Sequence, residues 1–390
     1  MEVNWPRVMP APRLEIDLTK IHHNASRLVA QFALQGIAIT GVCKATLGMA
    51  EVANTLRDAG VRYLADSHIE NIESMRRDGV CAEMVLIRSP MLSQVARVVA
   101  AADVSFNTEI DVIRHLSAAA QKTNRVHGVV LMVELGDRRE GIMPHDVLAM
   151  ARETLHLPNL VLKGIGTNLA CRNGICPDVT NMAELSALAD LIEATFEIKL
   201  ELVSGGNSAN VDWGLSHASA GRINNLRLGE SILLGCETLQ RQPIAGLYTD
   251  AFTLVAEVIE SNIKPSKPRG VAAQTAFGGV ATVLDRGLVM QSILAIGRQD
   301  IDPDGLVAPT GIEVMTASSD HLIVESEVTP LPVGAEVAFQ LNYTSLLLAM
   351  TSPFVAKIIK MDPRLMPVSA LSSLPNAYLV SQIPPALAQT

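Results

Sequence analysis

Aromatic residues, excess positive charge and long apolar runs are all scarce in this 390-residue sequence. Phe, Trp and Tyr together make up 3% of it, and 31 Lys and Arg stand against 40 Asp and Glu, giving a net charge of −9. A surface that binds nucleic acid needs cationic groups, and one that binds single strands also needs stacking aromatics, so no nucleic-acid partner is expected. No stretch of about eighteen residues is both apolar and free of charge, so neither a membrane span nor a membrane partner is expected.

Paired cysteines are also lacking. The sequence has five cysteines at irregular spacing, which is typical of reduced thiols in a cytoplasmic protein and not of a disulfide framework. Cys171 and Cys176 lie close together in CRNGIC, but no second Cys/His pair completes a set of four ligands, so no metal site is expected. The N-terminal stretch contains no uncharged apolar segment long enough for a secretory signal.

What the sequence does have is a regular alternation of short apolar runs and longer amphipathic stretches, which is typical of a parallel sheet built from βα units. Strands are expected at about residues 37–43, 63–66, 84–87, 104–106, 126–133, 160–166, 200–203 and 226–228. Helices are expected at about residues 49–59, 70–78, 92–101, 109–122, 145–155 and 179–196. Eight units over roughly 220 residues favour a closed (β/α)8 barrel, the TIM barrel, over an open doubly wound sheet.

The pattern changes after Gly246, where short runs rich in Val, Ile and Thr are separated by turns with Gly, Pro and Asp. These runs lie at residues 251–260, 270–276, 287–297, 311–316, 321–327 and 336–341. Since no long helical pattern intervenes, a separate β domain is expected. The predicted division is a barrel over 13–245, a smaller, mainly β domain over 246–360, which residues 1–12 could join, and a Pro-rich extension over 361–390.

In a barrel, chemistry gathers at the C-terminal ends of the strands, and the first of these ends carries Lys44. This lysine closes an apolar run, so its amine should project into the mouth of the barrel. A lysine partly removed from water has a lowered pKa and can form a Schiff base with a carbonyl carbon. The alternative is a strand-end lysine whose ammonium group only reaches solvent.

Later strand ends add groups that can bind an anion. Arg138 and Arg139 follow the fifth strand, so one guanidinium can point inward, although a surface loop with self-paired charges fits equally well. Two Gly-containing turns, at 203–209 and 225–231, each open a helix whose free N–H groups can bind phosphate. A phosphate cradle, a lysine and an arginine together suggest pyridoxal 5′-phosphate (PLP), or else a cofactor-independent Schiff-base aldolase acting on a phosphorylated sugar.

At these residues, and from about Leu14 to Tyr343, the sequence resembles the alanine racemase family of barrel-type PLP enzymes. The similar motifs are LEIDLTKIHHN, VCKA, VELGDRREGI, SGGNSAN and NLRLGE. Within that superfamily, YLADSHIENI, SGGNSAN, NLRLGES and AIGRQDIDPDG look most similar to the ornithine racemase-like branch. The resemblance implies an isomerase that interconverts L- and D-amino acids, of the ornithine or lysine type or with a broader range. It also implies a head-to-tail homodimer.

The resemblance further implies roles for individual residues. Lys44 would form the Schiff base with the cofactor, Arg139 would contact the ring hydroxyl, and Arg227 would face the pyridine nitrogen. Asn168 stands where the family usually has a histidine that stacks on the ring. The remaining cofactor-binding residues, from the two Gly-containing turns and a late Asn-Tyr pair, are Ser204, Ser208, Gly229, Glu230 and Tyr343.

Two departures from the family bear on the mechanism. Gly48 replaces a tyrosine four residues after the cofactor lysine, and no tyrosine lies near residues 277–282, where the family's opposite-face acid/base is expected. Racemisation needs an acid/base on each face of a planar carbanion, and Lys44 can serve one of them. For the other face we expect His321 of the partner subunit, with Asp320 as second choice, against the alternative of a turn that only links strands.

Other functions fit the same scaffold. A PLP-dependent lyase, such as a D-amino-acid dehydratase or aldolase, tends to carry a metal site in the β domain, and the region of Tyr343 and Ser345 lacks the expected His/Cys pair. A non-catalytic PLP carrier usually lacks the second domain, so the residues after Gly246 argue against it. Asp66 and Ser67, which end the second strand, could line the same mouth and offset the charge of a basic substrate.

Overall fold

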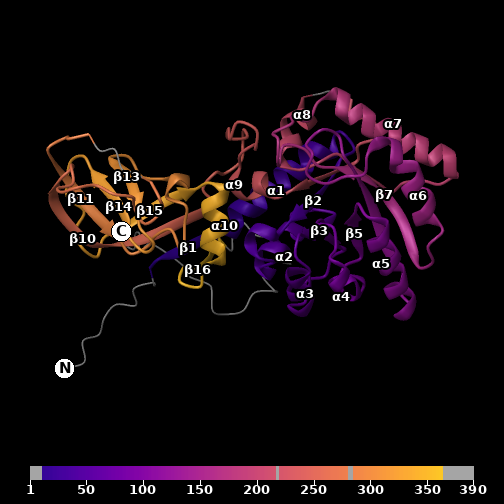
Figure 1. Ribbon diagram of the computed structural model, residues 1–390, viewed down its shortest axis with the longest axis horizontal. Helices are drawn as coiled ribbons and strands as arrows, with labels where there is room; N and C mark the ends of the chain where they lie inside the picture. The colour runs from indigo at the N-terminus through magenta and orange to yellow at the C-terminus, as the bar shows by residue number, and fades with distance from the viewer. Residues whose placement is uncertain (1–10, 217–218, 280–283, 363–390) are drawn as a thin grey trace, which may run out of the picture. The chain divides into compact units, whose positions relative to one another are not determined.

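The computed structural model describes residues 11–216, 219–279 and 284–362 (Figure 1). The described residues form two compact units, one of residues 18–249 and the other of residues 11–17 with 250–360. None of the described helices combines the length and the apolar character that a bilayer span requires. The Pro-rich extension expected over 361–390 lies outside the described residues from 363 onward, as do residues 1–10.

The larger unit is a closed barrel of eight parallel strands, so the expected (β/α)8 fold is confirmed. Its strands are β2 (Ala38–Val42), β3 (Tyr63–Asp66), β4 (Met84–Leu86), β5 (Val104–Asn107), β6 (His127–Val133), β7 (Leu160–Thr167), β8 (Leu202–Ser204) and β9 (Asn225–Leu228). The barrel closes where β9 pairs with β2, with Leu226 opposite Ile39. Each of the eight expected strand positions is occupied by one of these strands.

Helices follow the strands and cover the outside of the barrel (Figure 1). They are α1 (Leu18–Ala33), α2 (Ala50–Asp58), α3 (Ile69–Arg77), α4 (Val95–Ala101), α5 (Ile110–Lys122), α6 (Val147–Leu155), α7 (Val179–Phe196), α8 (Val211–Leu215) and α9 (Glu230–Leu234). In α5, Ile113, Leu116 and Ala120 recur at helical spacing and are fully buried, which explains why this amphipathic segment packs against the sheet. Short 3-10 turns begin two of the expected helices, at Leu92–Gln94 and Pro144–Asp146.

Alternate residues of the strands fill the interior of the barrel. The cluster packed there consists of Val42, Tyr63, Ala65, Val85, Val104, Phe106, Val130, Met132 and Leu202. Burying each of the larger side chains stabilises the fold by roughly 1.5–3 kcal/mol. Val42, the last residue of β2, belongs to this cluster, and Lys44 follows it as the first residue of a short 3-10 turn at the C-terminal end of the strand.

The smaller unit is mainly β, as expected. Its antiparallel path runs β12 (Leu306–Val307), β15 (Glu336–Leu341), β10 (Phe252–Pro265), β11 (Leu288–Leu294), β14 (Leu322–Ser326) and β13 (Ile312–Ala317). One short helix, α10 (Tyr343–Thr351), also belongs to it and follows the last of the expected runs. The apolar run of α10 buries Leu346, Ala349 and Met350, and the Asn342 side chain caps its first turn.

Two details of the smaller unit correct the sequence interpretation. The run 270–276 is not a strand, because the β10–β11 ladder ends at the Pro265–Leu288 pair and Val271 is fully exposed. Residues Arg13–Asp17 form β1, which pairs with β10 and with β16 (Ala356–Lys360). The barrel unit therefore starts at Leu18 and not at the predicted residue 13, since the ladder partners of Arg13–Asp17 are all in the β unit.

Candidate functional site

Lys44 opens a tight turn at the C-terminal end of β2. The carbonyl oxygen of Cys43 accepts hydrogen bonds from Thr46 N at 3.0 Å, Thr46 Oγ1 at 3.0 Å and Gly48 N at 3.2 Å. The Lys44 side chain is partly buried, and burial lowers the pKa of its amine, as do the positive charges of Arg139 and Arg227. Within the described part of the chain, no carboxylate forms an ion pair with Lys44. An amine held in this way is a better nucleophile at neutral pH than a free lysine.

Arg227 crosses the barrel interior from β9. Its side chain is 4% exposed and its guanidinium lies 5.2 Å from the ring centre of Phe106. It donates hydrogen bonds to Ser204 Oγ at 2.6 Å, to the Thr167 carbonyl at 2.8 Å and to Asn168 Oδ1 at 3.3 Å. Burial, together with the positive charge of the nearby Arg139, lowers the pKa of Arg227 to about 10.

Among the described residues, all hydrogen-bond acceptors of Arg227 are neutral oxygen atoms. Burying a cation without a carboxylate is costly, so its position reflects what the site binds more than what stabilises the fold. Ser204, which accepts one of its hydrogen bonds, donates in turn to Asn225 Oδ1 at 2.7 Å. The structure thus makes Ser204 a support for Arg227.

Asn168 stands at the end of β7 and is 9% exposed. Its Oδ1 atom accepts from Asn207 Nδ2 at 3.0 Å as well as from Arg227, while its own Nδ2 atom is buried without a hydrogen-bond partner. Buried amide groups are normally paired, so this unpaired donor indicates room for an acceptor that the chain itself does not provide.

The two Gly-containing turns lie beside each other after β8 and β9. Ser208 Oγ lies 3.0 Å from Ser231 Oγ and accepts a hydrogen bond from Ser231 N at 3.1 Å, so the hydroxyl group joins the turns. At the start of α9, which Gly229 caps, Ser231 N thus already has an acceptor, and Ile232 N donates to the Gly229 carbonyl at 3.1 Å. The carboxylate of Glu230 is paired with Arg241, so Glu230 can offer a phosphate only its backbone N–H.

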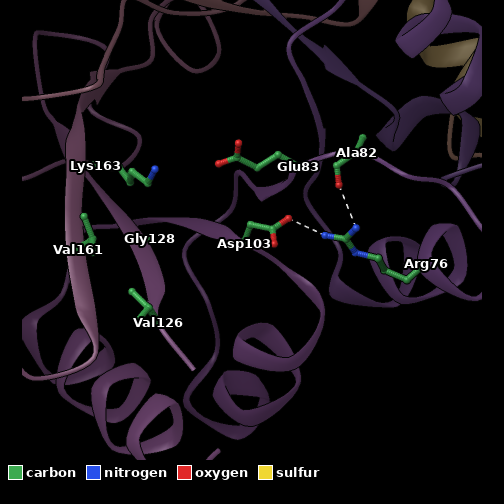
Figure 2. A pocket seen from close by; sticks show the side chains of 8 residues that line it. All are labelled: Arg76, Ala82, Glu83, Asp103, Val126, Gly128, Val161 and Lys163. Carbon is green, nitrogen blue, oxygen red and sulfur yellow. Dashed lines mark hydrogen bonds and ion pairs between the residues drawn. The ribbon is translucent and has the colours of Figure 1, made fainter. Parts of the chain in front are cut away.

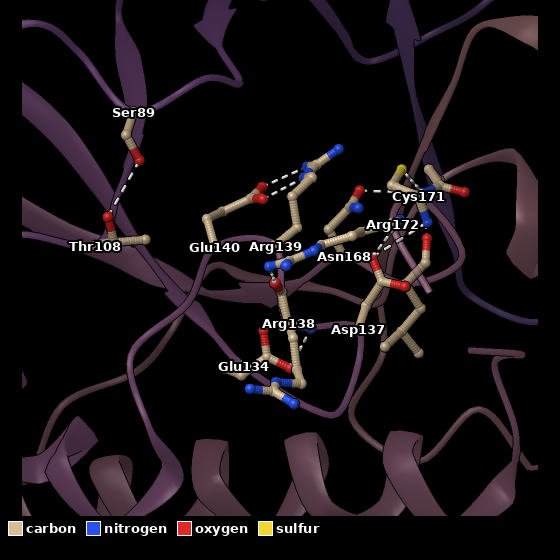
Figure 3. A network of polar contacts seen from close by, with 12 residues as sticks. Ser89, Thr108, Glu134, Asp137, Arg138, Arg139, Glu140, Asn168, Cys171 and Arg172 are labelled. Carbon is tan, nitrogen blue, oxygen red and sulfur yellow. Dashed lines mark hydrogen bonds and ion pairs between the residues drawn. The ribbon is translucent and has the colours of Figure 1, made fainter. Parts of the chain in front are cut away.

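The loop after β6 is fixed by two carboxylates, that of Glu134, which accepts from N–H groups inside the loop, and that of Asp137, which reaches a later segment (Figure 3). Asp137 is fully buried, and its carboxylate accepts from the N–H groups of Cys171 at 3.2 Å, Arg172 at 2.9 Å and Asn173 at 3.0 Å. Burial alone would raise the pKa of Asp137, but these backbone donors outweigh it and lower the pKa. Sequence analysis did not single out Asp137, because its role depends on a segment 34 residues later.

Arg139 is exposed and forms a forked ion pair with Glu140, whose hydrogen bond raises the pKa of Arg139 (Figure 3). The charge still acts on Lys44 and Arg227. Arg138 adopts a left-handed backbone conformation at φ 56° and is not among the main charges that shift the pKa of Lys44. The structure therefore distinguishes the two adjacent arginines, and Arg139 is the one that influences the site electrostatically.

Three of the predicted residues belong to the smaller unit. Tyr343 begins α10. His321 Nδ1 lies 2.8 Å from Asp320 Oδ1, and the hydrogen bond from His321 lowers the pKa of Asp320. The turn closes through Ser318, whose N–H donates to the His321 carbonyl and whose hydroxyl accepts from His321 N. That His321 or Asp320 acts as the second acid/base remains a prediction.

A second polar region lies where the barrel strands begin (Figure 2). A hollow of about 460 Å³ is lined by Glu83, Asp103 and Lys163 among others, and Arg76 contacts Asp103 at 2.5 Å. Lys163 also pairs with Glu201, which accepts a hydrogen bond from Tyr63 Oη at 3.0 Å. Charged groups at the N-terminal ends of barrel strands usually contribute to stability, whereas active sites lie at the C-terminal ends.

A family model described as "Alanine racemase, N-terminal domain" matches residues 16–235. An ornithine racemase of Acetoanaerobium sticklandii is 36% identical over 350 residues, which cover 89% of this chain and 99% of that protein. A lysine racemase of Thermotoga maritima is 35% identical over 353 residues, covering 90% and 99%.

Solved structures show the same fold. The structure of alanine racemase from Bartonella henselae with covalently bound pyridoxal phosphate superposes with a TM-score of 0.69 at 18% identity, covering 90% of this chain and all (100%) of that one. A D-threonine aldolase from Filomicrobium marinum gives a TM-score of 0.68 at 15% identity, covering 90% and 91%. At these identities the likeness concerns the fold alone.

Proposed function

The chain belongs to the alanine racemase family, and we propose that it is a PLP-dependent racemase that interconverts the enantiomers of ornithine or lysine. The isomerase activity expected from the sequence agrees with the racemase names of its relatives. The observation that carries the proposal is Lys44, an amine at a barrel strand end whose pKa is lowered by burial and by two arginines. The preference for a basic amino acid rests on the two relatives of 35–36% identity.

The residues around Lys44 fit the chemistry of PLP. Lys44 has no carboxylate partner among the described residues, Arg227 is a buried cation held by neutral oxygens, and Asn168 Nδ2 is a buried donor without an acceptor. Ser208 and the backbone N–H groups of Gly229 and Glu230, the residues that the family resemblance indicates, would hold the phosphate. When bound, PLP supplies an electron sink that lowers the barrier to removing the substrate's α-proton.

The chain's own residues supply the remaining functions. The Lys44 amine, whose pKa is lowered by burial, can remove and return a proton on one face of the substrate. The Arg227 guanidinium disfavours a second positive charge close to it, which limits protonation of a neighbouring ring nitrogen. Arg139, with Glu140, adds positive charge at the mouth. His321 and Asp320 remain our prediction for the opposite face.

The proposal is tested by following the α-proton of each amino acid in deuterated water. L-ornithine, L-lysine and L-alanine are incubated with the holoenzyme, and both deuterium content and chirality are measured. We expect exchange with inversion for the two basic amino acids, and no exchange with Lys44→Ala. Loss of the side chain or of the amino group would instead indicate a lyase, and no turnover a PLP carrier; either result overturns the proposal.

Two further parts of the proposal concern the state of the protein in the cell. We propose a head-to-tail homodimer, because the family resemblance implies it, and sedimentation at several concentrations tests it. We also propose a cytoplasmic location. Its support is the five free cysteines, three of which (Cys81, Cys171 and Cys176) are exposed, since reduced surface thiols are typical of reducing compartments.

A further inference from the structure

The turn that carries Lys44 is bent more sharply than a strand-to-helix connection requires. Leu47 and Gly48 both have left-handed backbone angles, with φ of 53° and 67°. Leu47 is not a glycine and its side chain is 42% exposed, so burial does not compensate for this conformation. Something outside the turn must hold the bend, in addition to the hydrogen bonds to the Cys43 carbonyl.

That support is α3. A Cβ atom at position 48 would lie 2.8 Å from the backbone oxygen of Asn71 and 2.9 Å from the Asn71 Cβ atom. Real Cβ atoms do not approach a backbone oxygen so closely, so any residue larger than glycine would push the turn and the helix apart. The absence of the family's tyrosine at this position thus has a physical reason, because the turn rests directly on α3.

The start of α3 is in turn fixed by Asp66. The Asp66 Oδ1 atom accepts from His68 N at 2.9 Å and from Asn71 Nδ2 at 3.0 Å, so it holds both the entry of the helix and the residue that meets Gly48. Asp66 is fully buried and its Oδ2 atom has no hydrogen-bond partner. A buried carboxylate with one unpaired oxygen is costly, which indicates that its position serves more than the stability of the fold.

We propose that Asp66 and Asn71 are positioning residues that set the place of the Lys44 amine, through the close contact between the Asn71 backbone and Gly48. Asp66 fixes Asn71, Asn71 supports the turn at Gly48, and the turn orients Lys44. This inference rests on the proposed role of Lys44 as the residue that bonds PLP. It assigns Asp66 a place behind the site, and not the contact with a basic substrate considered from the sequence.

The first experiment uses a pair of glycine variants. Gly48→Ala adds a methyl group against Asn71, whereas Gly79→Ala places one at a similar angle (φ 79°) with no atom within 4 Å, so both share the backbone strain and only the first has the clash. The purified apoproteins are mixed with PLP, reduced with borohydride, and the label on Lys44 is quantified by peptide mass spectrometry. We expect the labelling rate of Gly48→Ala to fall by about tenfold or more, and that of Gly79→Ala to stay within about twofold of wild type.

The second experiment keeps the inference testable if Gly48→Ala does not fold. Asp66→Ala removes the acceptor of both hydrogen bonds, whereas Asp66→Asn keeps an oxygen in its place and removes the buried charge. We expect slow labelling of Lys44 in Asp66→Ala and recovery to within about threefold of wild type in Asp66→Asn. The midpoint pH of labelling, recorded for each variant whose circular dichroism is native, reports the surroundings of the amine independently of turnover.

The outcomes separate this inference from the proposed function. If PLP labels wild-type protein at a residue other than Lys44, the proposed function is wrong. If Lys44 is labelled in wild type, and equally fast in folded Gly48→Ala or in Asp66→Ala, the positioning role is wrong and the proposed function is unaffected.

Discussion

The Nδ2 atom of Asn207 lies 3.0 Å from the Oδ1 atom of Asn168, and this contact joins the turn after β8 to the end of β7. The same nitrogen also donates to the Leu169 carbonyl at 2.9 Å, and Asn207 Oδ1 accepts from Ala209 N at 2.8 Å. One short side chain therefore holds the proposed phosphate turn against the residue beside Arg227. Its position in the fold makes it a determinant of cofactor affinity.

Replacing Asn207 with Ala should weaken PLP binding. The variant loses the hydrogen bonds that fix the turn carrying Ser208, so we expect the dissociation constant for PLP to rise by about tenfold, or 1.4 kcal/mol. Equilibrium dialysis of PLP against the apoprotein measures it. Asn54→Ala, which removes a single bond to Arg57 in α2, serves as the control and should bind PLP like wild type. Equal affinities for the two variants would rule out the role given to Asn207.

Arg227→Lys should destabilise the apoprotein. A lysine ammonium cannot reproduce the fork that reaches Ser204 Oγ and the Thr167 carbonyl together, so at least one buried acceptor is left unpaired. The expected loss is about 1–3 kcal/mol in the free energy of unfolding, measured by urea denaturation. A variant as stable as wild type would mean that the hydrogen bonds of Arg227 contribute little to the fold.

The pKa of Lys44 should depend on Arg139 and not on Arg138. A neighbouring cation favours the neutral amine, so removing the charge in Arg139→Gln should raise the pKa of Lys44 and move the midpoint of PLP labelling to higher pH. Because Arg139 is paired with Glu140, which offsets part of its charge, we expect the shift to be small. Arg138→Gln is the matched control with no expected shift. The same displacement in both variants would argue against a specific effect.

His127 should make the fold sensitive to acid. Burial lowers its pKa to about 4 from an ordinary value of 6.5, so the folded state keeps the imidazole neutral while the unfolded chain takes up a proton. Above pH 6.5 the imidazole is neutral in both states, so the fold has its full stability. As the pH falls from 6.5 toward 4, protonation favours the unfolded chain, and the free energy of unfolding decreases by about 3 kcal/mol. We expect His127→Gln to lose less stability than wild type between pH 7 and pH 4 in urea denaturation. Parallel pH profiles would contradict this assignment.

The sequence predicted the parts of this protein that depend on local pattern. Eight apolar runs at βα spacing predicted the barrel. Lys44 could be chosen because it lies at a strand end, and Arg227 because it lies within a short strand near a Gly-containing turn. The run 270–276 misled the prediction, because Val and Thr favour strands only where a neighbouring strand pairs with them. Strand β1 was missed because the strands that pair with it lie more than 200 residues later in the sequence.

Other features of the site could not be read from the sequence because they are contacts between distant segments. Asp137 meets residues 171–173, Asn207 meets Asn168, and Gly48 meets Asn71. In each case the sequence shows only a common polar residue or a glycine in a loop. Gly48 gave a signal as a departure from the family's tyrosine, but its meaning depends on how close α3 lies.

Because β1 pairs with both β10 and β16, its sheet can be completed only late in synthesis. Among the described strands, β1 leaves the ribosome first, and it pairs with Ala356–Lys360, whereas the barrel is encoded without interruption by residues 18–249. The barrel can thus fold on the ribosome while Arg13–Asp17 waits for partners that have not yet been translated. A fragment made of residues 250–360 alone would lack this strand and leave the ladder edges of both β10 and β16 open.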